Sequence, residues 1–164
     1  MSDRETQFRE FVAARMESLR GLAYLTCGDW QLAEDAVLAA LPRLYVKWNR
    51  IDNHDAYART AVVRAAIDET RRPWWKRERA AELLPERAEP DDATQAVHDR
   101  LHLRAALGRL PVRQRAVLVL RFLEGLSVQQ TAAALKCPEG TVKVYTARGL
   151  ATLRQILEAP YANR

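Results

Sequence analysis

The sequence has few of the residues on which disulfide-rich, metal-bound or secreted proteins depend. It contains two cysteines, Cys27 and Cys137, which lie far apart and fit no metal-ligand spacing. Six glycines exclude a collagen-like chain, and no uncharged apolar run approaches the length needed to cross a bilayer. The charged N-terminus is not followed by an apolar segment, so no signal peptide is recognised. We therefore expect a reduced, cytoplasmic protein without membrane insertion.

Signals for β-strands are also nearly absent. No Asn-Gly or Asp-Gly pair joins alternating apolar runs, and Ala, Leu, Arg and Glu dominate the chain. Apolar residues recur instead at helical spacing. The sequence therefore predicts an all-α fold with two small helical domains, at residues 5–75 and 99–158, joined by a flexible linker at 76–98. The linker is inferred from an acidic, Ala-rich stretch that two prolines interrupt.

Three helices are predicted in the first domain. An apolar stripe runs from Phe8 to Leu25 and stops at Gly28, after which Asp29 is a good N-cap for a second helix. A polar loop follows, with Asn53 as the candidate cap of a third helix over residues 55–72.

The second domain contains the strongest local signal, a helix-turn-helix. Helices are expected from Asp99 and from Pro111 through Phe122. Ser127 and Gln130 then fit a capping box, and Pro138 suits the first position of a further helix that extends to about residue 157. On that last helix the candidate DNA contacts lie outside the apolar face: Thr141, Lys143, Val144, Tyr145 and Arg148.

The positive charge lies mainly in the second domain. Residues 99–164 carry a net charge of +7, whereas residues 1–75 carry none, and the whole chain carries +5. A basic helix-turn-helix is typical of DNA binding. Arg113, Arg115 and Arg121 are expected to hold the DNA backbone from the supporting helices.

A second basic segment, residues 71–79, contains two adjacent tryptophans, Trp74 and Trp75. Cations interleaved with aromatic rings suit single-stranded DNA, whose bases are free to stack. The alternative is a domain edge where one tryptophan is core and the other covers it. The sequence does not decide between the two.

No catalytic site or cofactor site is recognised. His98 and His102 stand four residues apart, as zinc ligands on a helix do, but the metalloprotease glutamate is Asp99 here. A solvated helix face is the favoured interpretation, with a zinc enzyme as a remote alternative. We expect no metal, no cofactor, no small-molecule substrate and no enzymatic activity.

Three stretches of the chain resemble sigma-70 family RNA polymerase sigma factors of the small extracytoplasmic-function (ECF) type. Residues 28–48 resemble region 2.2, residues 55–72 resemble regions 2.3 and 2.4, and residues 110–143 resemble region 4. Within this type the chain looks most similar to the SigE family of actinobacteria. Region 4 is the most specific part of the resemblance.

The resemblance implies a transcription initiation factor with core RNA polymerase and promoter DNA as partners, and an anti-sigma factor as a further candidate. The first domain would dock on polymerase and read the −10 element, with the loop from Asn49 to Asp55 holding a flipped base. The second would read the −35 element through the helix-turn-helix candidates. The implied docking residues are Glu34, Asp35 and Leu41, and the implied −10 contacts are Asn53, Tyr57, Arg64, Arg71, Arg72 and Trp74.

The chain departs from the family pattern at two places. Leu38 and Ala39 stand where the family usually has polar residues, and Val144-Tyr145 stand where it usually has Ser-Arg. The first departure motivates an alternative function, a stand-alone helix-turn-helix regulator that no longer docks on polymerase.

Overall fold

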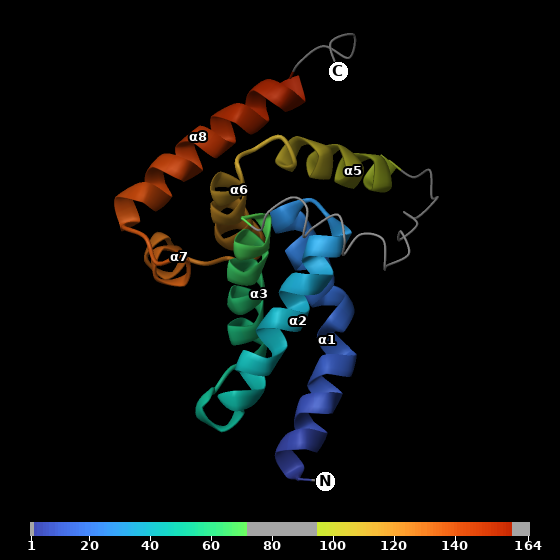
Figure 1. Cartoon of the computed structure of the whole chain (residues 1–164). Helices are drawn as coiled ribbons and strands as arrows, with labels where there is room; N and C mark the ends of the chain where they lie inside the picture. Colours follow the sequence, from blue (N-terminus) through green and yellow to red (C-terminus); the bar gives the residue numbers. More distant parts are fainter. Residues whose placement is uncertain (1, 72–94, 159–164) are drawn as a thin grey trace. The chain divides into compact units, whose positions relative to one another are not determined.

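A computed structural model describes residues 2–71 and 95–158, and Figure 1 shows their arrangement into helices. No strand occurs in these two ranges, which confirms the predicted all-α fold. The chain divides into two units, Met1–Glu86 and Arg87–Arg164. Among the residues described, no helix is long and apolar enough to span a membrane.

The first unit is a bundle of three helices with a short 3₁₀ turn before the third. Helix α2 runs opposite to α1 and α3 in Figure 1. The elements are α1 (Asp3–Cys27), α2 (Trp30–Val46), η1 (Trp48–Arg50) and α3 (His54–Thr70).

Helices α2 and α3 begin at the residues predicted to cap them, and α1 ends where the predicted apolar stripe stops. Gly28 ends α1 in the left-handed conformation, with φ 76°, which a glycine adopts without steric cost. The Asp29 carboxylate accepts a hydrogen bond from the Leu32 amide at 3.0 Å and so caps α2. The Asn53 side chain caps α3 by accepting from the Ala56 amide at 3.0 Å.

The core of the first unit is rich in alanine, which allows the helices to approach closely. Larger side chains fill the remaining space, and Leu19, Val37, Leu44 and Val62 are almost completely buried. The core alanines are Ala23, Ala33, Ala36, Ala40, Ala58, Ala65 and Ala66.

The second unit contains four α-helices and a π turn within its described residues. These are α5 (Gln95–Leu107), α6 (Val112–Leu118), the π turn η2 (Val119–Leu123), α7 (Val128–Leu135) and α8 (Glu139–Glu158). Helix α5 begins before the predicted start at Asp99, so the predicted linker overlaps its first turn.

The helix predicted from Pro111 through Phe122 is not a continuous α-helix. After Leu118 it passes into η2, where the Glu124 amide donates to the Val119 carbonyl five residues back, at 3.0 Å. The Arg121 guanidinium donates to the Leu126 carbonyl at 2.9 Å and closes the following turn. This side chain therefore stabilises the exit from η2.

Helices α6 and α8 pack together at a glycine. A Cβ atom added at Gly149 would lie 2.9 Å from Cδ1 of Leu118, which is closer than side chains pack. Leu118 is buried at this contact. Gly149 is therefore the residue that allows α8 to lie close to α6.

Candidate nucleic-acid interface

The turn between α7 and α8 sets the direction of the candidate recognition helix. The predicted capping box is confirmed: the Ser127 hydroxyl accepts from the Gln130 amide at 3.0 Å, and the Gln130 side chain accepts from the Ser127 amide at 2.9 Å. Lys136 ends α7 with φ 55° and ψ 48°, in the left-handed region. The Pro138 carbonyl then accepts from the Thr141 amide at 3.0 Å and begins the first turn of α8.

Four of the five candidates on α8 lie on one stripe of the helix. Thr141, Val144, Tyr145 and Arg148 follow the spacing i, i+3, i+4 and i+7, which places them one above another. Val144 and Arg148 are exposed, and Thr141 and Tyr145 are half-buried. Lys143 is also exposed, but it lies on a different side of the helix, about 100° round from Val144. The stripe presents a hydroxyl, a phenol, an apolar side chain and a guanidinium, which together suit base edges and phosphates.

A second face of α8, about a third of a turn round from this stripe, is buried against the rest of the second unit. Val142 and Gly149 are buried, and Thr146 and Leu153 are half-buried. The Thr146 hydroxyl donates to the Val142 carbonyl at 2.7 Å, so this polar group is satisfied within the helix.

The expectation that Arg115 holds the DNA backbone is wrong. Its side chain is buried, and Nη2 donates to the carbonyls of Leu110 at 3.0 Å and Gly108 at 3.4 Å. Arg115 therefore ties the start of α6 to the turn before it. Arg121 is likewise engaged with the backbone at Leu126. Arg113 is half-buried at the surface. Its contact with the DNA backbone stays a prediction.

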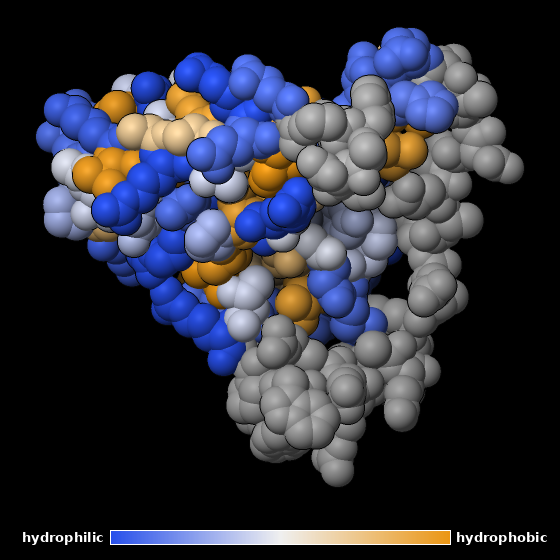
Figure 2. Space-filling model, turned by 90° about the horizontal axis from the view of Figure 1, so that it is seen from above, coloured by the Kyte–Doolittle hydropathy of each residue, from blue (hydrophilic) through white to orange (hydrophobic). Residues whose placement is uncertain are grey.

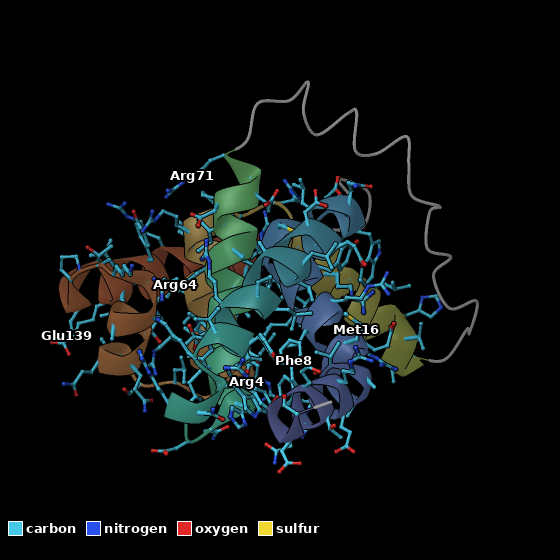
Figure 3. All side chains as sticks on the ribbon, turned by 60° about the horizontal axis from the view of Figure 1, so that its bottom comes forward. Arg4, Phe8, Met16, Arg64, Arg71 and Glu139 are labelled. Atoms are coloured by element: carbon cyan, nitrogen blue, oxygen red, sulfur yellow. The ribbon has the colours of Figure 1, made fainter. Side chains whose placement is uncertain are left out.

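In the first unit, three of the candidates lie along one face of α3. Tyr57, Arg64 and Arg71 are spaced by seven residues. Seven residues are nearly two turns of an α-helix, so the three side chains lie on nearly the same side. Figure 3 labels Arg64 and Arg71 on this helix. The Lys47 ammonium lies 5.9 Å from the centre of the Tyr57 ring and adds a cation at the start of the face.

Of the remaining predicted −10 contacts in the first unit, the structure describes only Asn53. Asn53 is exposed, but its side-chain oxygen is engaged in capping α3. Arg72 and Trp74, together with Trp75, lie outside the described residues.

The part of the chain that is described contains no group of three metal-ligating side chains. On the face that Figure 2 presents, hydrophilic residues alternate with apolar ones over the coloured atoms.

Comparison with known proteins decides the family. Residues 100–153 match the family described as Sigma-70, region 4. The chain is 38% identical over 160 residues to the RNA polymerase sigma-E factor of Streptomyces coelicolor, a match that covers 93% of this chain and 87% of that protein. The chain belongs to the ECF-type sigma factors of the sigma-70 family.

Two further similarities agree with this assignment. The sigma factor is 41% identical over 69 residues to the ECF RNA polymerase sigma factor SigX of Bacillus subtilis, which covers 42% of this chain and 36% of that one. Its fold resembles the sigma factor RpoE of Bartonella quintana, solved with the anti-sigma factor NepR, with a TM-score of 0.70 at 22% identity over 93% of this chain and 98% of that chain.

Of the three residues expected to dock on polymerase, Leu41 is buried in the core of the sigma factor. Its side chain is 9% exposed and packs among the helices of the first unit, so it offers little surface to a partner. The Glu34 carboxylate lies 2.7 Å from the Arg20 guanidinium of α1 and so also joins two helices. Asp35 is half-buried on the same helix.

An apolar stripe on α2 was not recognised from the sequence. Leu38, Pro42 and Val46 are spaced by four residues and are all exposed, Leu38 to 54% and Val46 to 73%. Apolar side chains of this size on one exposed face of a helix are typical of a binding surface. The signal was available in the spacing, but Leu38, Pro42 and Val46 were not considered together as one face of the helix.

Proposed function

We propose that this chain binds core RNA polymerase through the first unit and directs it to promoters by contacts from both units. The observation that carries the proposal is the identity with sigma-E factors over most of the chain, together with an exposed, basic recognition helix behind a complete capping box. The same identity favours this function over that of a stand-alone regulator.

The second unit would place α8 in the major groove of the −35 element. Thr141, Tyr145 and Arg148 would meet base edges, while Lys143 would contact a phosphate. Val144 would contact the methyl group of a thymine, a contact that an apolar Val side chain makes better than the Ser that the family usually has at this position. The −35 preference of this chain would then differ from that of relatives with Ser-Arg at these positions.

The face of α3 would read the −10 element once the strands separate. Arg64 and Arg71 supply charge along the helix, and Tyr57 supplies a ring on which a base can stack. The predicted contacts Asn53, Arg72 and Trp74 stay part of this proposal. The described geometry supports it through the common face of Tyr57, Arg64 and Arg71.

The polymerase would contact the α2 stripe, defined as Leu38, Pro42 and Val46. Apolar contact there would replace the polar contact that the family usually makes at position 38. Glu34 and Asp35 lie one turn before Leu38 and would border the same surface. An anti-sigma factor stays a predicted partner of the chain.

Co-elution with core RNA polymerase of the source bacterium, followed by transcription from genomic DNA, tests the proposal. A stoichiometric complex that starts transcripts at discrete sites is the expected result. A chain that elutes free of polymerase and still binds duplex DNA would contradict it and favour the stand-alone regulator.

A further inference from the structure

A stacked pair of rings closes the loop between α2 and α3, defined here as residues 47–53. The His54 ring lies parallel to the Trp48 indole, with a centroid separation of 3.5 Å and an angle of 3° between the planes. His54 Nε2 also lies 2.9 Å from the Trp48 carbonyl oxygen. Because a carbonyl oxygen only accepts, Nε2 carries the proton and donates. Two interactions therefore join the two ends of the loop.

Trp48 is in turn fixed from α1, so the closed loop has a rigid base. Phe8 and Phe11 meet the Trp48 ring edge-on, at 5.7 and 5.6 Å between centroids. The Trp48 Nε1–H donates to the Gln7 side chain at 3.2 Å. Trp48 is 5% exposed, and Figure 3 shows Phe8 on α1. Movement of the loop would require this whole ring cluster to open.

The outer side of the same loop presents polar groups. Asn49, Arg50, Asp52 and Asn53 are all exposed. They provide amide donors and acceptors, a carboxylate and a guanidinium within a short stretch of chain. These groups can hydrogen-bond the edge of an unpaired base and pair with its phosphate. The buried contacts of the loop therefore fix its conformation, and its exposed side chains provide the groups that can bind a base.

We propose that His54 is a positioning residue that sets which base the α2–α3 loop selects, although its own side chain faces Trp48 and not the nucleic acid. The inference rests on the proposed function, because it assigns the loop to an unpaired base of the promoter strand. A loop that is already shaped before binding loses little conformational freedom on binding, and it rejects bases that would require a different shape.

Removal of the ring should affect base selection more than overall stability. In His54→Ala the loop keeps all of its exposed polar groups but loses the stack and the hydrogen bond that hold them in place. His54→Phe keeps the stack without the hydrogen bond and should restore part of the selectivity. His98→Ala removes an exposed imidazole from α5 and is the matched control.

The experiment uses the chain assembled with core RNA polymerase and a pool of short randomised single-stranded deoxyoligonucleotides. Bound strands are sequenced to give the preference among the four bases at each position. Hydrogen exchange of residues 47–57 in the free chain is measured in parallel. We expect His54→Ala to speed exchange in the loop and to weaken the preference at one position about tenfold, the size of one good base contact. His98→Ala should change neither.

The outcomes separate the inference from the proposed function. If the wild-type complex prefers no base anywhere, the proposed reading of the strand is wrong, and the inference falls with it. If the wild type discriminates and His54→Ala discriminates equally well, only the inference is overturned. Should His54→Ala fail to fold, His54→Gln keeps a donor without the ring, and unchanged discrimination by that variant would overturn the inference in the same way.

Discussion

Gly149 leaves no room for even one methyl group between α6 and α8. In Gly149→Ala the new Cβ would lie 2.9 Å from Leu118 Cδ1, and Leu118 is only 3% exposed, so it has little space into which to move. Overpacking of this kind costs about 1–3 kcal/mol, and the better helix propensity of alanine returns about 1 kcal/mol. We expect the free energy of unfolding to fall by about 1 kcal/mol in urea titrations.

Gly140→Ala is the control for this prediction, because it places the same methyl group on the same helix. No atom lies within 4 Å of a Cβ at that position. The free energy of unfolding should stay the same or rise slightly. A loss of stability equal to that of Gly149→Ala would show that crowding at Leu118 is not the cause.

Arg115 stabilises the second unit and does not contact DNA. Arg115→Met keeps most of the buried volume but leaves the Gly108 and Leu110 carbonyls without the guanidinium donor. Unsatisfied buried polar groups cost about 1–3 kcal/mol. We expect a lower midpoint of thermal unfolding with an unchanged salt dependence of DNA binding. A weaker salt dependence would return Arg115 to the phosphate-binding role that the charge pattern suggests.

Sequence composition identifies cations but does not decide which of them are exposed. Arg113 and Arg115 look alike in the sequence, yet Arg115 is buried and Arg113 is not. The helical stripe on α8 was predictable because its inner and outer positions differ in polarity. The difference between the two arginines depends on carbonyl groups in the preceding turn, which the periodicity of α6 does not reveal.

The apolar stripe of α2 makes a specific prediction for polymerase binding. Leu38→Glu puts a charge in a surface that we propose is desolvated in the complex, so the affinity for core polymerase should fall by about 2 kcal/mol, or roughly 30-fold. Since Leu38 is exposed, the thermal midpoint of the free chain should not change. Titration of labelled chain with core polymerase measures the effect.

Leu157→Glu is the matched control, because Leu157 is an exposed leucine at the end of α8. It should leave the polymerase affinity unaltered. Equal weakening by both substitutions would indicate a general effect of added negative charge and would contradict docking through α2.

The ends of helices were predictable where a side chain makes the cap. Asp29, Asn53 and Ser127 were each expected at an N-terminus, and each accepts the backbone hydrogen bond that was expected. Lys136 was not recognised as left-handed, because lysine has no preference for that conformation. The π turn was also missed, since its apolar residues fit an ordinary α-helix equally well.

The uneven charge of the chain predicts how its DNA binding responds to salt. The positive charge lies mainly in residues 99–164, so affinity for duplex DNA should fall linearly on a double-logarithmic plot against salt. Lys143→Ala should reduce the slope by about 1, as expected for one lost phosphate contact. Fluorescence anisotropy over a range of salt concentrations gives the slope.

Arg9→Ala changes the net charge of the chain by the same amount at an exposed position of α1. Its slope should match that of the wild type. If Arg9→Ala and Lys143→Ala shift the slope equally, net charge alone controls binding and α8 is not the contact.

The overall organisation of the chain was predictable because each unit has its own apolar pattern and its own charge. The four-residue spacing of the α2 stripe was present in the sequence. Spacing alone does not show that the neighbouring helices leave Leu38 uncovered while they bury Leu41.

The π turn at Val119–Leu123 makes the second unit sensitive to the loss of a single residue at this position. A hydrogen bond to the fifth residue back holds one residue more than an α-helical turn does. Each residue of an α-helix contributes about 100° of rotation. Deletion of a single codon here would convert the turn to α-helix and re-aim the chain that leads to α7. A one-residue deletion at this position would therefore change the direction of the chain after α6.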